Sequence, residues 1–375
     1  MAPALHHSGG TIVEPVDLPV NKRHLDMVYS HLKYSDKPLM GSVTAPERAE
    51  DSVEMAKIAL GADAIAAKKI PGGVLWFERD GETYRKAYGQ RALAPAAEPI
   101  SEDTIYDAAS LTKVVATTTA VLQLVERGQL ALDAPVVRYL PAFAQHGKSA
   151  VTVRQLPMHH SGLRPDVDTK PVWSGYDTGV ALACEEKLRS TPGSTFVYSD
   201  INFIILGELV RIVSGLRLDD YTVKEIFQPL KMVDSGFLPP AAKLARVAPT
   251  ELTDGQMLRG VVHDPTTRFM DGVAGHAGLF TTTKDLARFC RMVINGGELD
   301  GVRVLDAASV AEMTRVQNDG SSRRGLGWDI DTSYSGPRGR WQVNLTPMAA
   351  STEGRTLKIT GTGQAAVEIR DVVVG

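Results

Sequence analysis

The strongest constraint on the fold is a change of pattern along the middle of the chain, from strand-forming to helix-forming sequence. Gly72–Phe77 (GGVLWF) is a short apolar run rich in strand formers, and Tyr84–Tyr88 looks like a returning strand. Arg79–Glu82 supplies a glycine-containing turn between them, so the segment predicts a β-hairpin. A long helical pattern follows at Leu111–Gly128, with apolar residues along one side and a glycine as its stop.

The rest of the chain adds helices and a few late strands. Four more helices are predicted, at residues 179–188, 202–214, 284–294 and 307–316. Strand-like sequence returns in the tail, at Leu357–Thr360 and Ala366–Val374. We therefore expect an α/β fold in which an antiparallel sheet is flanked by helices, with an all-helical lobe and the active site in the cleft between them.

Charge and composition exclude several classes of function. The 375 residues carry 41 basic and 44 acidic side chains, a formal net charge of -3, which gives no reason to expect a nucleic acid or an acidic membrane surface as partner. The sequence has no run of about 18 apolar residues, so no membrane-spanning helix is expected. The N-terminus has no signal-peptide pattern, and a cytoplasmic protein is expected. No cofactor is expected, and the oligomeric state stays open.

Cysteine and histidine usage predicts no metal site. Cys184 and Cys290 are the only cysteines, and we expect two reduced, buried thiols, with a single disulfide as the alternative. Residues 6–7 and 159–160 are pairs of adjacent histidines, and neither has the spacing of a zinc motif.

A serine and a lysine three residues apart open the long helix, in the motif Ser110-Leu111-Thr112-Lys113. Residues i and i+3 share a helix face, so the Lys113 amine can reach the Ser110 hydroxyl. The helix N-terminus favours developing negative charge, and a neutral amine whose pKa is lowered by burial can take the hydroxyl proton. By spacing alone the motif is weak, because Ser30–Lys33 repeats it and a helix cap with a solvated lysine is the alternative.

A tyrosine before a second helix is the next candidate. Tyr198–Asp200 (YSD) precedes the helix predicted at 202–214, and a tyrosine near a Ser–Lys pair can act as a proton shuttle if positive charge lowers its pKa. The alternative is a capped helix start with a packed aromatic side chain. Tyr34–Asp36 repeats the triplet, but it begins four residues after Ser30, a spacing that cannot place a tyrosine across a cleft from a serine.

A glycine-rich turn at Gly275–Phe280 (GHAGLF) is the third motif. His276 in this turn could serve as a general base, although a tight turn with a structural histidine is the favoured interpretation. Together with Asp200, residues His276 and Gly278 are the candidate substrate-binding residues.

Four segments, in this order, resemble the class C β-lactamase family, which includes β-lactamases, family VIII esterases and D-Ala-D-Ala peptidases. They are residues 106–113 (YDAASLTK), 155–163 (QLPMHHSGL), 196–207 (FVYSDINFIILG) and 262–289 (VHDPTTRFMDGVAGHAGLFTTTKDLARF). The resemblance covers about Ala64–Arg338 and implies a β-lactamase/transpeptidase-like fold. It also implies that Ser110 is the acylated nucleophile, Lys113 the general-base partner and Tyr198 the second base. Members of this family are often periplasmic or secreted.

The chain departs from the family's pattern at two points. Asp200 stands where the family usually has Asn, although Asp occurs in its esterase-like branches, and the added negative charge counts against penicillin turnover. The family's third box, Lys-Thr-Gly or His-Thr-Gly, is expected on a strand shortly after Trp328, whereas the nearest match is Ile359–Gly361, which comes later and lacks the basic residue. That strand normally donates an oxyanion-hole N–H worth about 2.7–4 kcal/mol. The family's last strands and C-terminal helix also have no counterpart.

The two ends resemble other proteins. Pro3–Ala56 is similar to an internal piece of a trimethylamine methyltransferase, and Trp341–Gly375 is similar to a stretch upstream of the catalytic serine of a sialate O-acetylesterase. We therefore expect a chimera with a foreign leader at 1–63, a serine hydrolase domain at 64–338 and a foreign tail at 339–375. The opposing interpretation is a divergent intact enzyme whose tail supplies the missing strands.

Two functions fit these observations. The first is acyl transfer through a Ser110 acyl-enzyme, on a small-molecule acyl substrate that is a β-lactam, a small ester or a D-Ala-terminated peptide. The second is a catalytically impaired or inactive chimera with an incomplete sheet. Corrinoid-dependent methyl transfer is rejected, because a fragment of a (β/α)₈ barrel cannot close one.

Overall fold

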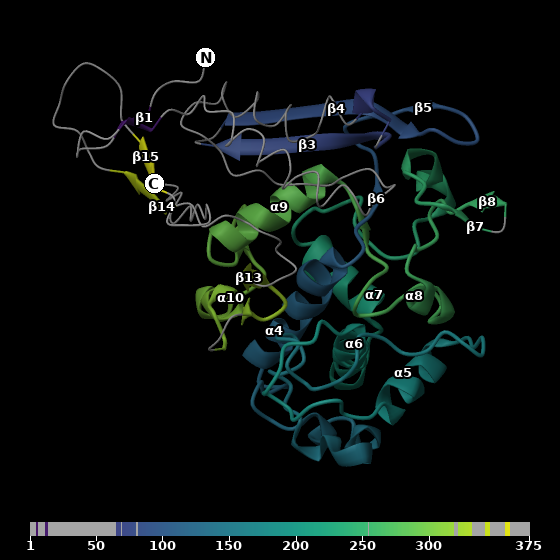
Figure 1. Cartoon of the computed structure of the whole chain (residues 1–375), viewed down its shortest axis with the longest axis vertical. Helices are drawn as coiled ribbons and strands as arrows, with labels where there is room; N and C mark the ends of the chain where they lie inside the picture. The colour runs from purple at the N-terminus through teal and green to yellow at the C-terminus, as the bar shows by residue number, and fades with distance from the viewer. Residues whose placement is uncertain are drawn as a thin grey trace. The chain divides into compact units, whose positions relative to one another are not determined.

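The computed structural model describes residues 5–6, 12–13, 65–68, 70–79, 82–253, 255–318, 322–331, 342–345 and 357–360 (Figure 1). The chain divides into two compact units, residues 1–88 with 333–375, and residues 89–332. Among the described residues, no helix is both long enough and apolar enough to cross a lipid bilayer.

Antiparallel strands make up most of the described part of the first unit. Strands β3 (Gly72–Arg79) and β4 (Glu82–Ala92) are neighbours in one sheet, which confirms the predicted hairpin. Leu75 is buried there against Tyr84 and Tyr88, whose hydroxyl oxygens lie 2.7 Å apart.

The remaining strands of this unit form two short pairs. They are β1 (Leu5–His6) with β2 (Ile12–Val13), and β14 (Gln342–Leu345) with β15 (Leu357–Thr360). The strand expected at 357–360 is therefore confirmed, and the strand expected at 366–374 lies outside the described residues.

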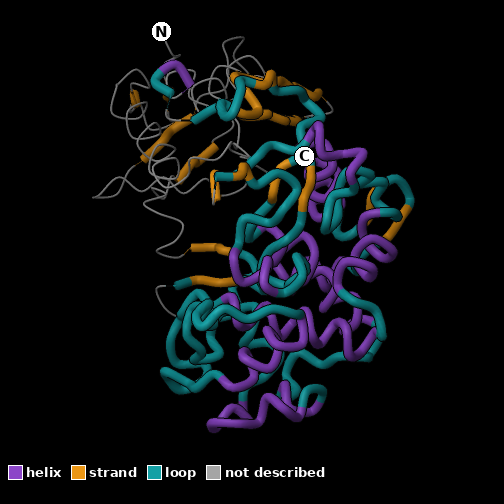
Figure 2. Tube along the Cα trace, turned by 90° about the vertical axis from the view of Figure 1, so that its right-hand side faces the viewer, coloured by secondary structure: helices purple, strands orange, loops and turns teal. Residues whose placement is uncertain are grey.

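The second unit is mainly helical, as the purple segments of Figure 2 show. Its helices are η1 (Lys113–Thr118), α4 (Thr119–Glu126), η2 (Val136–Arg138), η3 (Pro141–Ala150), α5 (Tyr176–Glu185), α6 (Asp200–Ser214), α7 (Leu218–Thr222), η4 (Val223–Phe227), η5 (Ala241–Arg246), α8 (Pro265–Phe269), α9 (Thr283–Ile294) and α10 (Ala307–Thr314). Its short strands are β5 (Glu98–Pro99), β6 (Tyr106–Asp107), β7 (Leu252–Thr253), β8 (Gln256–Met257), β9 (Phe280–Thr281), β10 (Glu298–Leu299), β11 (Val302–Arg303), β12 (Arg323–Arg324) and β13 (Asp329–Asp331). All five predicted helices are confirmed.

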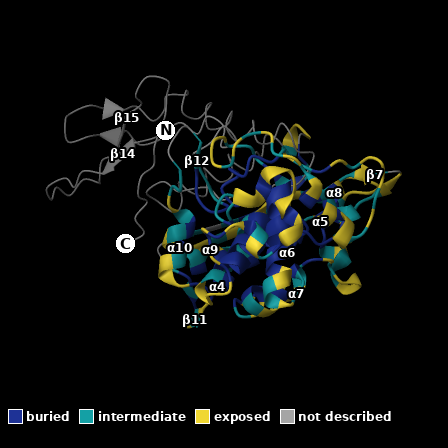
Figure 3. Ribbon diagram, turned by 90° about the horizontal axis from the view of Figure 1, so that it is seen from below, coloured by how far each residue is buried: buried dark blue, intermediate teal, exposed yellow. Residues whose placement is uncertain are grey.

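Helix α6 is the buried centre of this helical unit. Every residue from Ile201 to Val210 is buried, because apolar residues lie around the whole helix and not only along one stripe. The polar Asn202 and Glu208 are buried with them. Helices α4, α5 and α7 pack against it, and Figure 3 shows the buried residues, in dark blue, gathered where these helices meet. The helix ends at Gly215, whose left-handed φ of 76° suits a residue without a Cβ. Each fully buried Phe, Ile or Leu contributes about 1.5–3 kcal/mol.

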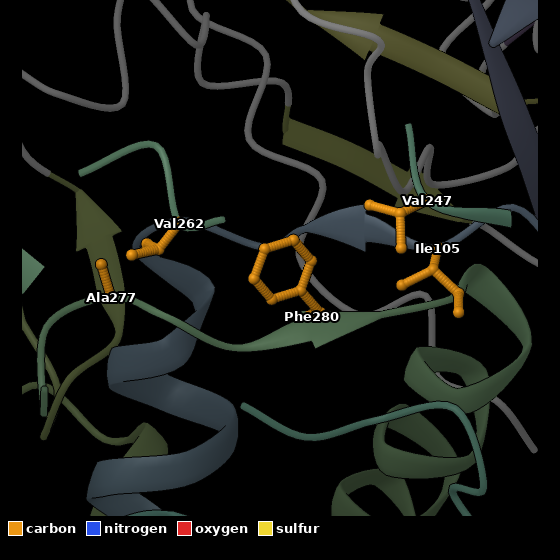
Figure 4. Close-up of a cluster of buried hydrophobic side chains, with 5 residues drawn as sticks. All are labelled: Ile105, Val247, Val262, Ala277 and Phe280. Atoms are coloured by element: carbon orange, nitrogen blue, oxygen red, sulfur yellow. The ribbon is translucent and has the colours of Figure 1, made fainter. Parts of the chain in front are cut away.

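A short strand pair fixes the chain just before the helix that begins near Ser110. Strand β6 pairs with β9, with Tyr106 opposite Thr281 and Asp107 opposite Phe280. Behind this pair lies a cluster of buried side chains from distant parts of the sequence, shown in Figure 4: Ile105, Val247, Val262, Ala277 and Phe280. This packing holds the start of η1 and the Gly275–Phe280 turn next to each other.

The cysteine prediction is half wrong. Neither cysteine is in a disulfide, and Cys184 is buried as expected, but Cys290 is exposed. Helix α9 explains the difference, because its buried residues include Asp285, Phe289 and Met292, and Cys290 lies on the other side.

Candidate active site

The serine and lysine of the first motif are in direct contact. Lys113 Nζ donates a hydrogen bond of 2.9 Å to Ser110 Oγ. Ser110 is exposed, whereas Lys113 is 2% exposed. No acceptor for the Ser110 N–H is found among the described residues. The contact between Lys113 and Ser110 confirms the prediction that the Lys113 amine reaches the Ser110 hydroxyl across one helix face.

Local geometry presents Ser110 at a sharp bend. Ala109 has φ 46°, in the left-handed region that costs a residue with a side chain about 1–3 kcal/mol. Asp107 holds the bend, since its Oδ1 accepts from Ala109 N at 2.8 Å while its Oδ2 accepts from His263 N at 2.7 Å. The helix then opens as a π-turn over Lys113–Thr118, a feature frequent at functional sites.

Lys113 is surrounded by negative and π-electron-rich groups. Its Nζ lies 2.7 Å from Asp200 Oδ1, 3.2 Å from the carbonyl oxygen of His276, and 4.8 Å from the ring centroid of Tyr198. Burial alone would lower the pKa of Lys113, but the charge of Asp200, the Tyr198 oxygen and hydrogen bonds to both raise it above its usual value. The direction is opposite to the one that burial alone predicts, because of the carboxylate at position 200, and the general-base role of Lys113 stays a prediction.

Tyr198 is half-buried and held by a histidine. The His159 ring stacks on the Tyr198 ring, with centroids 4.3 Å apart and planes 26° apart. His159 Nδ1 accepts from Ser199 N at 2.9 Å, while Ser199 Oγ donates to the carbonyl oxygen of Arg164 at 2.6 Å instead of capping α6. Burial, followed by the positive charges of Arg324 and Lys113, lowers the pKa of His159 well below its usual value. His159 is thus a neutral acceptor that orients the tyrosine segment.

His276 lies beside the site as part of a buried pair. Its Nε2 is 2.8 Å from Asp264 Oδ1 and 2.9 Å from Thr267 Oγ1. Burial would lower the pKa of His276, but the hydrogen bond and charge of Asp264 raise it, and the same pair lowers the pKa of Asp264. The side chain of His276 is 1% exposed, and its carbonyl oxygen, not its ring, meets Lys113.

Glycines let the His276 turn approach the helices closely. A Cβ on Gly275 would stand 1.9 Å from the carbonyl oxygen of Phe203 in α6, and Thr117 Oγ1 donates to the Gly275 carbonyl oxygen at 2.6 Å. Gly278 is buried with φ 113°, and a Cβ there would stand 2.8 Å from the carbonyl oxygen of Gly272. The structure thus brings together Ser110, Lys113, Tyr198, Asp200 and the His276 carbonyl, and it places Gly278 in the packing of the turn.

Asp200, Asp264 and His276 also come close enough to share a cation, because their ligand atoms all lie within 4.8 Å of one another. All three groups already have charge partners. The ammonium of Lys113 lies beside Asp200, and the His276 ring is paired with Asp264. The arrangement therefore needs no metal ion to balance its charge.

Two contributors to the site were missed from the sequence. Asp264 caps α8, with its Oδ1 accepting from Thr267 N at 2.7 Å, and its position directly before Pro265 is a recognisable helix-start signal. Arg324 is 3% exposed, and no pattern in the sequence marks it, because its contacts to Phe196 and Asp329 depend on the fold.

Two families match the sequence. The Beta-lactamase family matches residues 57–373, and the Trimethylamine methyltransferase (MTTB) family matches residues 1–72, which confirms the resemblance of the leader. The first match extends across the tail, whose likeness to a sialate O-acetylesterase stays a prediction, as do the domain boundaries at 63 and 338.

A curated relative and two solved structures are also similar. A candidate D-alanyl-D-alanine carboxypeptidase of Escherichia coli K12 is 32% identical over 285 residues, which is 66% of this chain and 65% of that protein, so the chain spans just under two thirds of this relative. A class C beta-lactamase is 22% identical with a TM-score of 0.61, covering 76% of each chain. A hydrolase with promiscuous acyltransferase activity is 21% identical with a TM-score of 0.62, covering 76% of this chain and 84% of the other.

These similarities confirm the β-lactamase/transpeptidase-like fold expected from the four segments. The family match covers most of the chain, including Ser110, Lys113 and Tyr198. The chain therefore belongs to the beta-lactamase family of serine hydrolases.

Proposed function

We propose that this chain hydrolyses a small acyl substrate through a covalent acyl-enzyme on Ser110. The observation that carries the proposal is the contact between an exposed serine oxygen and a buried ammonium, Ser110 Oγ to Lys113 Nζ at 2.9 Å. A charged donor at this distance orients the hydroxyl and stabilises the negative charge that develops on its oxygen.

The division of roles follows from the charge on Lys113. An ammonium cannot accept a proton, and it donates its hydrogen bond to Ser110 Oγ, which leaves the serine proton for another acceptor. Tyr198 and Asp200 both lie beside Lys113, and Tyr198 is the one that the family resemblance assigns as a base. In this proposal Tyr198 accepts the Ser110 proton, while Lys113 holds both oxygens in place.

The proposed reaction balances in two steps. Ser110 Oγ forms a bond to the substrate carbonyl carbon, its proton moves to the Tyr198 oxygen, and the bond from that carbon to the leaving oxygen or nitrogen breaks as the leaving atom takes the proton. Water then attacks the acyl ester and gives a proton to Tyr198. The ester bond breaks, Ser110 Oγ recovers the proton, and the free acid leaves. The Ser110 N–H donates to the carbonyl oxygen in both steps.

Among β-lactams, D-Ala-terminated peptides and small esters, neutral esters suit this site best. Asp200 brings a carboxylate within 2.7 Å of Lys113 and cancels the charge that would attract an anionic substrate. β-Lactams and D-Ala peptides carry a carboxylate, and a neutral ester does not. Turnover of p-nitrophenyl butyrate should therefore exceed turnover of nitrocefin.

Mass spectrometry after treatment with a fluorophosphonate tests the nucleophile. A single covalent adduct is expected on the peptide that contains Ser110, and Ser110→Ala should abolish it. Ser30→Ala is the matched control, because Ser30 belongs to the other Ser–Lys spacing in the sequence and should leave labelling intact. A chain without any adduct would instead support the inactive chimera.

A further inference from the structure

Thr112 lies inside the Ser–Lys motif, and its hydroxyl joins two segments of the site that are far apart in the sequence. The side chain is fully buried. Its Oγ1 donates to the carbonyl oxygen of Ala109 at 2.6 Å and accepts from the Leu279 N–H at 3.1 Å. The Thr112 N–H donates to the same Ala109 carbonyl oxygen at 3.0 Å. Thr112 therefore connects the bend before Ser110 to the glycine-rich turn at 275–280.

The carbonyl group that Thr112 holds belongs to the same peptide bond as the Ser110 N–H. Among the described residues, the cis peptide bonds are those before Pro95 and Pro171, so the Ala109–Ser110 peptide is trans. In a planar trans peptide the C=O and the N–H point in opposite directions. Two hydrogen bonds on the Ala109 carbonyl oxygen therefore fix the direction of the Ser110 N–H, which the proposed acyl transfer uses as a donor to the substrate carbonyl oxygen.

The bend needs support on both of its peptide bonds, because Ala109 lies in the left-handed region with φ 46°. Asp107 holds the peptide before Ala109, since its Oδ1 accepts from Ala109 N. Thr112 holds the peptide after Ala109 through the carbonyl oxygen. Leu279 contacts both sides, because its carbonyl oxygen accepts from Ala108 N at 2.8 Å while its N–H donates to the Thr112 hydroxyl. A hydrogen bond to a peptide carbonyl oxygen also polarises the amide and strengthens its N–H as a donor.

We propose that Thr112 is a positioning residue for acyl transfer, whose hydroxyl holds the Ala109–Ser110 peptide so that the Ser110 N–H faces the oxygen of the tetrahedral intermediate. The inference rests on the proposed function for its effect on catalysis, whereas its effect on the peptide can be measured without any substrate.

The direct test is an NMR measurement of the Ala109–Ser110 peptide. Isotope labels on the carbonyl carbon of alanine and the nitrogen of serine select Ala–Ser peptide bonds, which occur in this sequence at Ser110, Ser309 and Ser351. Ser110→Ala identifies the Ser110 signal by removing it. Thr112→Val keeps the branched shape of the side chain and removes the hydroxyl, so it should shift the Ser110 signal and leave the Ser309 signal in place.

Two further variants separate the hydrogen bond from a general change in packing. Thr112→Ser keeps the hydroxyl, so the Ser110 signal should return toward its wild-type position. Thr119→Val is the matched control, because Thr119 is also fully buried and donates to a carbonyl oxygen one turn earlier, that of Val114, at 3.0 Å. This bond does not reach the bend, so Thr119→Val should leave the Ser110 signal unchanged.

A second readout links the peptide to catalysis. Thr112→Val should lower kcat on p-nitrophenyl butyrate by about 10-fold or more, which is less than the ~100–1,000-fold for loss of a whole oxyanion donor, because the Ser110 N–H remains but is less well aimed. KM should change by less than about 3-fold, since this donor acts mainly in the transition state. Thr112→Ser should recover most of kcat, and Thr119→Val should keep the wild-type value.

Each outcome decides a different question. An unchanged Ser110 signal in Thr112→Val overturns the inference, whatever the activity. A shifted signal with an unchanged kcat, in a chain that hydrolyses esters, overturns the catalytic role of Thr112. A shifted signal in a chain without hydrolysis or a Ser110 adduct refutes the proposed function and leaves the orienting role of the hydroxyl standing.

A matched pair of smaller side chains guards against loss of structure in Thr112→Val. Thr112→Cys and Thr112→Ser have the same shape, but a thiol is a much weaker donor and acceptor than a hydroxyl. Thr112→Cys should therefore shift the Ser110 signal in the direction expected for Thr112→Val, and its kcat should fall below that of Thr112→Ser. Equal signals and equal kcat values in the Cys and Ser variants would contradict a role for the hydroxyl.

Discussion

Replacing Asp200 with Asn should destabilise the protein through Lys113. Asp200 Oδ1 and Lys113 Nζ lie 2.7 Å apart, with side chains 23% and 3% exposed. At this separation two unit charges interact by about 6 kcal/mol at an effective dielectric constant of ~20. The Asn side chain still offers an oxygen to Lys113, and the Lys113 amine can lose its proton. We therefore expect the free energy of unfolding to fall by about 2–3 kcal/mol, less than the ~3–5 kcal/mol for a buried charge left without any partner. The melting temperature should fall by about 5–10 °C.

The loss should also depend on pH, with a definite sign. In the wild type the folded pKa of Lys113 is raised, so the stabilisation is fully present below the unfolded pKa of about 10.4 and is lost as pH rises through the folded value. In Asp200→Asn, burial prevails and the folded pKa of Lys113 drops below about 10.4. At a pH between the folded and the unfolded pKa of Lys113, unfolding of the variant takes up a proton, so the stability of the variant rises with pH in that range. The difference in melting temperature between the wild type and Asp200→Asn should therefore become smaller from neutral pH to about pH 10.

Thermal melting across this pH range checks both the size and the trend. Asp168→Asn is the control, because Asp168 pairs with Arg164 at 2.8 Å but is 76% exposed. A surface ion pair of this kind contributes less than about 1 kcal/mol to stability. The difference in melting temperature between the wild type and Asp168→Asn should therefore not change over this pH range. If Asp200→Asn melts like Asp168→Asn at every pH, Lys113 does not carry the buried charge inferred here.

Two further substitutions test the nucleophile and the turn beside it. Ser110→Ala should lower ester hydrolysis by at least ~1,000-fold, while Ser30→Ala should leave it unchanged, and steady-state rates on p-nitrophenyl butyrate decide between them. Gly275→Ala should cost about 3 kcal/mol in chemical denaturation, because its Cβ would stand 1.9 Å from the Phe203 carbonyl oxygen. Gly236→Ala, with nothing within 4 Å of the added Cβ, should cost less than about 1 kcal/mol, and equal losses in the two variants would refute the close-approach explanation.

The features that the sequence predicted are those set by local spacing. The contact between Ser110 and Lys113 follows from helix geometry over three residues, and the five helices follow from apolar periodicity. The exposure of Cys290 could also have been foreseen, since Phe289 and Met292 define the buried side of α9. The Tyr-Ser-Asp motif named Tyr198 as a candidate, and only the resemblance assigned it the role of second base, because no local rule places it beside Lys113.

The features that the sequence did not predict depend on contacts between distant segments. The protonation of Lys113 is set by a carboxylate at the start of another helix, and burial alone suggested the opposite direction. The partnership of Asp264 with His276 crosses a turn whose shape depends on glycines. The direction of a pKa shift can therefore be predicted only when the positions of the neighbouring charges in the folded structure are known.

In the proposed mechanism the carboxylate that stabilises Lys113 also decides which residue can act as base, and a double-mutant cycle tests this. The proposal has Lys113 as an ammonium and Tyr198 as the proton acceptor when Asp200 is present, so Tyr198→Phe should cost about 100-fold or more in kcat/KM. In the Asp200→Asn background the Lys113 pKa falls, and its amine becomes a second acceptor 2.9 Å from Ser110 Oγ. Tyr198→Phe should then cost at least ~10-fold less than in the wild type. An equal cost in both backgrounds would mean that Lys113 never accepts the proton, and the charge of Asp200 would then have no part in choosing the base.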